Sequence, residues 1–259
     1  MIAVCIKWLG DAPTSGLSAA DEAAIEMALR HGEVTRSSVI AVTVGASHAD
    51  TALRIALACG VRTAIRVDAP DDMDSASVAA ALAPVVAHSA AVWCGDYSSD
   101  RGTGSVPAFL AAHLRRQQAL GLIGVELTDP LRVIRRLDGG RREVLRITGP
   151  AVLSVEGSIA RLRRAPLRPA LAAQTAEVLP YGTHVVPHGN SSLLVRPYRP
   201  RPRVLPPPEG NTLDRLRTLT DASSAPEPGE TIAVGPQDAA RRMIEVLAGW
   251  GYLELGDER

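Results

Sequence analysis

The sequence lacks an excess of charge of either sign. Lys plus Arg and Asp plus Glu each number 28 among 259 residues, so the formal net charge is zero. Without a long-range positive field, the chain is not expected to bind nucleic acid or to be drawn to an anionic membrane surface. Small molecules and other proteins are the expected partners.

Long apolar runs are also missing. Nowhere do about 18 apolar residues follow one another, which is the length that a membrane-spanning helix needs. The first apolar run, within residues 1–7, is too short for a signal peptide. These absences predict a soluble, cytoplasmic protein without direct membrane insertion.

Cysteine is scarce. Cys5, Cys59 and Cys94 stand apart inside apolar runs, without the close paired spacing of thiolate metal sites. We expect them to be reduced and buried, and to act as small hydrophobic residues.

Catalytic motifs are absent as well. The chain has no Gly-x-Ser-x-Gly elbow and no Walker-type phosphate loop. Its six histidines form no i, i+4 pair on a predicted helix, and His184 and His188 lie in a Gly/Pro-rich segment. Without an acid, a base or a nucleophile in a recognisable arrangement, the chain is not expected to be an enzyme by itself or to bind a metal.

What the sequence does contain is an alternation of short apolar runs with segments of helical period, which is typical of parallel strands joined by crossover helices. The runs are almost continuously apolar, so the strands should be buried on both faces. This predicts a three-layer, doubly wound α/β fold with a mostly parallel sheet. The expected strands are residues 2–6, 38–44, 63–67 and 90–94, and the expected helices are residues 19–31, 49–59 and 74–88, the first ending at Gly32.

The pattern changes after Leu114. Two strand-like segments, residues 131–137 and 142–147, flank Asp138-Gly139-Gly140, which predicts an antiparallel hairpin with a bulged turn. A further buried run at residues 150–155 is a candidate to return to the parallel sheet.

The composition changes again at about Arg196. Residues 196–208 are rich in Pro and Arg and predict an extended arm. A short helix at residues 213–219, a spacer at 223–230 and an amphipathic helix at 236–249 should follow. We therefore expect a nucleotide-binding α/β domain over residues 1–195 and an arm with a C-terminal helix over residues 196–259. That helix packs either on its own domain or on a partner subunit.

A loop of small residues, Gly95 to Pro107, follows the fourth strand and precedes a helix. Such a loop lets backbone N–H groups approach an anion, and the next helix adds its positive N-terminal end. The loop is therefore a candidate phosphate site at the carboxyl edge of the sheet, with an ordinary strand-to-helix turn as the alternative. Lys7 and Gly45, which follow the first two strands, would border the same mononucleotide pocket, or Lys7 is a solvated charge.

Several motifs occur in a characteristic order. They are Val4-Cys5-Ile6-Lys7, a helix start reading Asp21-Glu22-x-Ala24-x-Glu26-x-Ala28-x-Arg30, the run Leu53-Arg54-x-Ala56-Leu57-Ala58-x-Gly60, the loop Gly95 to Pro107 and the late Pro150-Ala151-Val152. Together they resemble the beta subunit of electron transfer flavoproteins. The resemblance covers about residues 1–175, and the C-terminal arm in layout. The ending around Trp250 resembles divergent actinobacterial members that are associated with mycofactocin gene clusters.

The resemblance implies a heterodimer in which a larger alpha subunit holds the FAD. That flavin carries electrons from a dehydrogenase to a downstream acceptor, while this subunit binds AMP and performs no chemistry of its own. A second FAD in place of AMP is the less favoured cofactor, and a stand-alone nucleotide-binding regulator of the universal-stress type is the alternative function. By position, the implied AMP contacts are Cys5, Lys7, Ala20, Asp21, Val44, Asp100, Gly102, Thr103, Gly104, Ser105 and Val106.

The chain departs from the family pattern in several places, one of which is Ala20, where the family often has a bulky residue. In the nucleotide loop, Ser105 and Pro107 stand where the family usually has Gln and Gly. After the last strand, the family's Asn-Glu-Pro docking segment is absent, although Leu167 matches its anchoring leucine by position. Arg163 and Arg164, just before Leu167, belong either to the docking surface or to a solvated basic face. We therefore expect the choice of dehydrogenase partner to differ from that of other members.

Overall fold

The computed structural model of the chain describes residues 1–10, 16–71, 73–98, 100, 102–182, 210–220, 233–250 and 252. The chain divides into two compact units, Met1–Leu193 and Leu194–Arg259, which are described separately. Within the described ranges, no helix is both long enough and apolar enough to cross a membrane.

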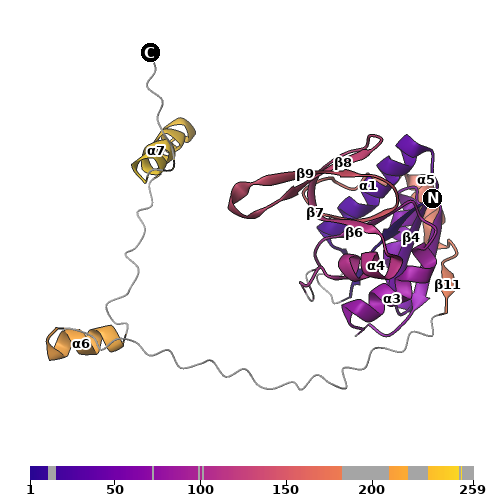
Figure 1. Cartoon of the computed structure of the whole chain (residues 1–259), viewed down its shortest axis with the longest axis horizontal. Coiled ribbons are helices and arrows are strands. Elements are labelled where there is room, and N and C mark those ends of the chain that lie inside the picture. Colours follow the sequence, from indigo (N-terminus) through magenta and orange to yellow (C-terminus); the bar gives the residue numbers. More distant parts are fainter. Residues whose placement is uncertain are drawn as a thin grey trace, which may run out of the picture. The chain divides into compact units, whose positions relative to one another are not determined.

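A nine-stranded mixed sheet forms the centre of the first unit (Figure 1). The strand order is β11-β5-β4-β1-β6-β10-β7-β8-β9. Neighbours from β11 to β7 are parallel, whereas β7 with β8 and β8 with β9 are antiparallel. The sheet strands are β1 Ile2–Cys5, β4 Val39–Gly45, β5 Thr63–Asp68, β6 Ala91–Gly95, β7 Gln117–Glu126, β8 Leu131–Arg136, β9 Arg142–Ile147, β10 Ala151–Val155 and β11 Leu179–Tyr181, and a separate pair is formed by β2 Trp8–Leu9 and β3 Gly16–Leu17.

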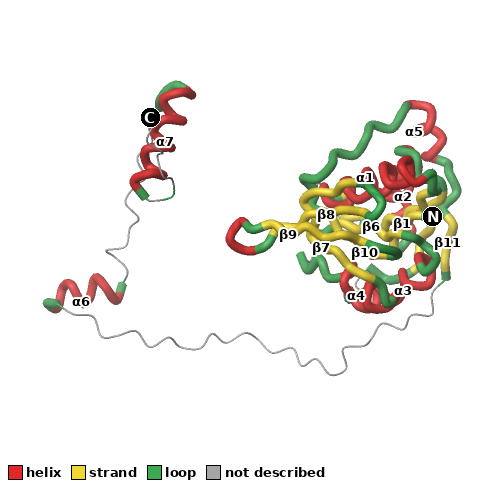
Figure 2. The backbone as a smooth tube through the Cα atoms, turned by 45° about the horizontal axis from the view of Figure 1, so that its top comes forward, coloured by secondary structure: helices red, strands yellow, loops and turns green. Residues whose placement is uncertain are grey.

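Helices cover both faces of the sheet, so the predicted three-layer α/β fold is confirmed (Figures 1 and 2). Alternate residues of the central strands face opposite layers. Ile2 and Val4 of β1 pack in the cluster that includes α1 and α2, while Ala3 and Cys5 pack in the cluster of α3 and α4. The helices of this unit are α1 Ala19–Thr35, α2 Asp50–Ala58, α3 Ser75–Val86, α4 Val106–Leu114 and α5 Leu167–Gln174, with short 3-10 turns at Ser47–Ala49 and Asp138–Gly140.

Helix α1 is longer than the sequence predicts. Its N-terminus is capped as expected, because the Ser18 hydroxyl accepts from the Asp21 N–H at 3.0 Å. The predicted end at Gly32 is wrong, since the helix continues to Thr35 and closes on Arg36 in the left-handed conformation. Gly32 serves a different purpose there: a Cβ at this position would lie 2.6 Å from the Val39 side chain, so glycine lets the helix pass close to the start of β4.

The segment after α4 confirms two predictions and adds elements that the sequence did not reveal. Strands β8 and β9 form the predicted hairpin, in which Arg136 pairs with Arg142 across the turn. Strand β10 returns to the parallel sheet, between β6 and β7. Strand β7, helix α5 and the edge strand β11 were not predicted as separate elements.

In the second unit the structure describes two helices, α6 Thr212–Leu219 and α7 Pro236–Gly249, and both were predicted. Helix α7 and its C-cap residue carry exposed apolar side chains, with Met243 65% and Trp250 71% exposed. The predicted Pro-rich arm at residues 196–208 and the spacer at 223–230 lie outside the described residues. The packing of α7 on its own domain or on a partner stays a prediction.

Candidate functional site

A pocket opens where the parallel strands β1, β4 and β6 end, which we call the strand-end pocket. Strand β1 lies between β4 and β6, so the chain leaves the sheet in opposite directions on its two sides. Ligands of open α/β sheets bind at such a switch point. The pocket is lined by Cys5, Ile6, Lys7, Asp21, Val42, Val44, Pro70, Asp71, Met73, Ser75, Val78, Leu82, Cys94, Gly95, Tyr97, Ser98, Thr103, Gly104, Ser105, Val106 and Pro107.

The two sides of the strand-end pocket differ in chemistry. Val42 and Val44 of β4 face Val78 and Leu82 of α3, and these side chains give an apolar side. The opposite side carries polar groups from the end of β1, the start of α1 and the loop between β6 and α4. An apolar wall with a few convergent polar groups is the usual composition of a small-molecule site.

The loop before α4 lines the pocket with Thr103, Gly104 and Ser105. Gly104 has a φ of +54°, and a Cβ there would lie 2.1 Å from the Asp96 carbonyl oxygen, so this position requires glycine. Ser105 is the N-cap residue of α4, but its side chain makes no capping hydrogen bond. The first N–H groups of α4 therefore have no side-chain cap, which leaves them suited to an anion.

Lys7, the only lysine in the sequence, extends from the end of β1 toward this loop. Its ammonium forms an ion pair with the Asp100 carboxylate, and the two side chains are 42% and 39% exposed. A pair this exposed contributes little to stability, about 0–1 kcal/mol. Lys7 is thus held at the pocket rim by a contact that another anion can replace at small cost.

Asp21 is the buried carboxyl group of the strand-end pocket. Burial raises its pKa to about 7, although hydrogen bonds from the Ser18 hydroxyl and the Lys7 N–H, together with the Lys7 charge, act in the opposite direction. The Ser18 hydroxyl donates to the Asp21 carboxyl at 2.9 Å. The Asp21 side chain is 6% exposed. Because its pKa is about 7, the carboxyl group is partly protonated and partly ionised near neutral pH.

Most of the residues predicted to bind a nucleotide surround this pocket. Cys5, Lys7, Asp21, Val44, Thr103, Gly104, Ser105 and Val106 line it. The other three residues do not line the pocket but contact residues that do. Ala20 packs against Gly95, Asp100 forms an ion pair with Lys7, and Gly102 lies beside Tyr97. Their role in binding stays a prediction.

Sequence reasoning missed the wall that α3 contributes. Met73, Ser75, Val78 and Leu82 line the strand-end pocket from this element and the turn before it. The only signal for them is the apolar periodicity of the helix, which does not say which residues border a cavity.

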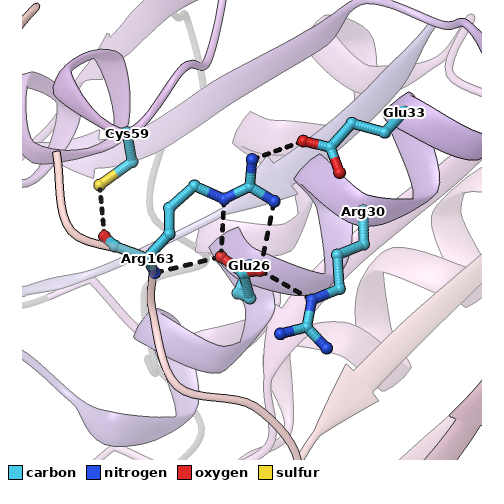
Figure 3. A network of polar contacts seen from close by, with 5 residues as sticks. All are labelled: Glu26, Arg30, Glu33, Cys59 and Arg163. Carbon is cyan, nitrogen blue, oxygen red and sulfur yellow. Dashed lines mark hydrogen bonds and ion pairs between the residues drawn. The ribbon is translucent and has the colours of Figure 1, made fainter. Parts of the chain in front are cut away.

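The basic segment before Leu167 makes its contacts within the same chain, with residues of α1 and the end of α2 (Figure 3). The Arg163 side chain donates to Glu26 at 2.9 Å and to Glu33 at 2.5 Å, and its backbone N–H donates to Glu26 at 3.1 Å. Arg30 donates to the same Glu26 carboxylate at 2.7 Å, and the Cys59 thiol donates to the Arg163 carbonyl at 3.5 Å. Arg163 therefore fixes the chain before α5 against α1 and α2.

Burial alone would raise the pKa of Glu26, but hydrogen bonds from Arg163 and Arg30 outweigh it and the pKa is lowered. Glu26 is 4% exposed and ionised. Beyond this anchor, Arg164 is exposed, and α5 exposes Leu167 to 75% and Leu171 to 55%. These two leucines are four residues apart and share one helix face. A docking role for Leu167, Arg163 and Arg164 stays a prediction.

No group of three His, Cys, Asp or Glu side chains in the described part of the chain is placed to hold a metal ion. The fold and the strand-end pocket define an α/β protein with a pocket at the switch point of its sheet.

Comparison with known proteins gives the family. Residues 10–180 match the family model described as Electron transfer flavoprotein domain. The chain is 32% identical over 159 residues to the protein named Electron transfer flavoprotein subunit beta of Methylophilus methylotrophus, a match that covers 59% of this chain and 60% of that protein. The chain belongs to the electron transfer flavoprotein family. The resemblance predicted from its motifs is confirmed, while the association with mycofactocin clusters stays a prediction.

Proposed function

We propose that this chain is the beta subunit of a heterodimeric electron transfer flavoprotein and that it binds AMP in the strand-end pocket. The observation that carries the proposal is the uncapped start of α4, which faces the pocket beside Lys7 and opposite an apolar wall. One end of the pocket suits a purine ring and the other suits a phosphate.

The residues present fit AMP. The side chains of Val42, Val44, Val78 and Leu82 offer the apolar contact that an adenine ring requires. The N–H groups near Thr103, Gly104 and Ser105 would hold the phosphate, with the Lys7 ammonium exchanging Asp100 for it. A second FAD in place of AMP is an outcome that the experiment below distinguishes.

The FAD would be held mainly by the alpha subunit, where it accepts electrons from a dehydrogenase and passes them to a downstream acceptor. This chain would hold its nucleotide, support the partner subunit and take part in docking. The exposed Leu167 and Leu171 of α5, next to Arg164, are the proposed contact for the dehydrogenase. The arm with α6 and α7 is the proposed contact for the alpha subunit. A cytoplasmic location, with no catalytic residues of its own, belongs to the same proposal.

The family match supports this function over a stand-alone universal-stress-type regulator. The test is co-expression with the homologous alpha chain, followed by size-exclusion chromatography with flavin absorbance and nucleotide analysis of the denatured complex. A one-to-one yellow complex that releases FAD and AMP is expected. Two FAD per complex would replace AMP in the proposal, and a colourless monomer that holds ATP or no nucleotide would overturn it.

A pair of glycine variants tests the site itself. Gly104→Ala should lower AMP affinity at least about tenfold, because the added Cβ collides with the Asp96 carbonyl and displaces the loop. Gly139→Ala is the matched control, since Gly139 also has a positive φ, +69°, but has no atom within 4 Å of its Cβ position. Isothermal titration calorimetry measures both. Equal affinities for AMP would show that the nucleotide binds elsewhere.

A further inference from the structure

Two of the three cysteines lie side by side. In the parallel pairing of β1 with β6, Cys5 is directly opposite Cys94. Both side chains lie on the sheet face that α3 and α4 cover, and both line the strand-end pocket. They are 7% and 4% exposed.

The strand spacing places these thiols within reach of a covalent bond. Neighbouring strands lie about 4.8 Å apart. A disulfide joins residues whose Cα atoms are about 4.4–6.8 Å apart. The backbone positions of Cys5 and Cys94 therefore lie within the range that a disulfide spans.

We propose that Cys5 and Cys94 form a two-thiol modification site in the floor of the strand-end pocket, which closes reversibly to a disulfide when the pocket holds no nucleotide. With hydrogen peroxide as oxidant, both S–H bonds break and one S–S bond forms. The two electrons and two protons released reduce one peroxide molecule to two water molecules. A thiol reductant reverses the step by disulfide exchange.

The surroundings make this a slow reaction. The hydrogen bond with Cys5, then burial and the charge of Asp21, raise the pKa of the Cys94 thiol well above its usual value. Since the thiolate is the species that attacks peroxide, little of the reactive form is present at neutral pH. The pair is thus suited to sustained oxidation rather than to rapid catalytic turnover.

Bound AMP should protect the Cys5 and Cys94 thiols from oxidation because of where they lie. This part of the inference rests on the proposed function. Both thiols border the space in which AMP is proposed to lie, so a bound nucleotide excludes the oxidant. If reaction requires the empty pocket, the rate should fall by the factor by which AMP depletes the free protein, which is about 100-fold at 100 times Kd.

Cys59 provides an internal control. It is 8% exposed, comparable to the other two, but it packs in the cluster on the opposite face of the sheet and donates to the Arg163 carbonyl. It has no second thiol beside it and does not line the strand-end pocket. Oxidation should therefore leave Cys59 as a free thiol.

The experiment uses the full chain, reduced and desalted, and then exposed to hydrogen peroxide with and without AMP. Free thiols are alkylated at each time point and the protein is digested with trypsin, which places the cysteines on peptides 1–7, 55–62 and 67–101. We expect peptides 1–7 and 67–101 to become linked with the loss of two hydrogens and to separate again with dithiothreitol. AMP at 100 times Kd should slow the linkage about 100-fold.

Each outcome decides the proposal. Oxidation of single thiols without linkage, or linkage that involves peptide 55–62 equally, would overturn it. So would linkage at an unchanged rate when calorimetry shows that AMP is bound. If calorimetry shows no AMP binding, the proposed function fails, while the reaction without nucleotide still decides whether the two-thiol site exists. Cys59→Ser should retain the linkage, and Cys5→Ser and Cys94→Ser should each abolish it.

Discussion

Two regions of helix α1 hold a buried carboxyl group in opposite electrostatic states. At the start of the helix, burial raises the pKa of Asp21 to about 7. Five residues later, the pKa of Glu26 is lowered in spite of burial, because Arg163 and Arg30 donate to it. The two side chains are similarly inaccessible to solvent, 6% and 4% exposed, but Asp21 lies deeper in the protein, so burial costs its charged form more. The partners add to the difference: two guanidinium groups bind Glu26, whereas Asp21 has a hydroxyl, a backbone N–H and a more distant ammonium.

This comparison separates a structural site from a candidate functional one. The Glu26 region fixes the segment before α5 and is electrostatically satisfied. The Asp21 region borders the strand-end pocket and carries an ionisable group near its midpoint at neutral pH. Perturbed groups of the second kind cluster at functional sites.

The largest effect is expected at the Glu26 region. Arg163→Ala should lower the free energy of unfolding by about 3 kcal/mol, because it leaves a buried carboxylate short of its main partner. Urea unfolding at pH 7, followed by circular dichroism, measures the change. Arg164→Ala, which truncates the exposed neighbour, should change stability by no more than about 0.5 kcal/mol.

A double variant checks the cause. When Glu26→Gln is added to Arg163→Ala, no charge remains to be buried, so the pair should be less destabilised than the two single effects added together. Strict additivity would contradict the assignment of Arg163 as the counter-ion of Glu26.

The next effect is expected at Asp21. Its folded-state pKa of about 7 lies above its ordinary value of 3.8, so the stability it gives is complete below about pH 4 and is lost as the pH rises through 7. Asn carries no charge, so Asp21→Asn should be more stable than the wild type at pH 8 by about 2 kcal/mol. The difference should shrink as the pH is lowered toward 4.

Urea unfolding across this pH range tests the sign. Glu22→Gln, one residue along the same helix but only partly buried, is the control for loss of a charge from the first turn. A wild-type advantage at pH 8 would mean that the ionised Asp21 has a stabilising partner that the comparison overlooks.

A smaller effect is expected at Lys7, which links Asp21 to the proposed phosphate end. Lys7→Gln should weaken AMP binding about tenfold, or about 1.4 kcal/mol, by removing a charged donor. Because the Lys7 charge lowers the pKa of Asp21, the same variant should move the Asp21 titration further upward. Calorimetry measures the affinity, and Arg146→Gln, on the exposed side of β9, controls for lost positive charge. Unchanged affinity would remove Lys7 from the site.

The smallest effect is expected at His31, a third titratable group on α1. Burial lowers the pKa of His31, whose Nδ1 accepts from the Trp93 indole N–H at 3.2 Å. Its stabilising contribution is therefore present above pH 6.5 and lost as the pH falls below that value. In His31→Gln, the free energy of unfolding should fall by about 1 kcal/mol less than in the wild type when the pH is lowered to 5.

Unfolding at pH 7.5 and pH 5 compares His31→Gln with the wild type, and His113→Gln, an exposed histidine on α4, is the control. If the loss of unfolding free energy at pH 5 is equally reduced in His113→Gln, the loss arises from general charge effects and not from His31.

Much of the parallel sheet was predictable because strands that are buried on both faces consist of almost continuous runs of apolar residues. The predicted strands at residues 38–44 and 90–94 differ from β4 and β6 by a single residue at each end. Strand β7 was missed because it begins with Gln117 and Gln118 and only part of it is buried. Helix α5 was missed because it is only eight residues long and Pro169 lies inside it.

The candidate site was predictable where loops follow strand ends, since parallel strands bring those loops to one edge. What the sequence did not reveal were contacts between distant segments. Arg163 lies 137 residues from Glu26, and a basic run alone does not distinguish a solvated face from an internal ion pair. In the same way, the pairing of Cys5 with Cys94 depends on which strands become neighbours.

The position of β10 between β6 and β7 sets an order of assembly during synthesis. Until Ala151–Val155 has left the ribosome, no strand can link β6 to the β7–β9 meander in the order that the finished sheet has. The elements that line the strand-end pocket are complete by the end of α4, at Leu114. A nascent chain can thus assemble the residues that line the strand-end pocket before β10 is synthesised, and a nucleotide bound at that stage would stabilise the part already folded against misfolding.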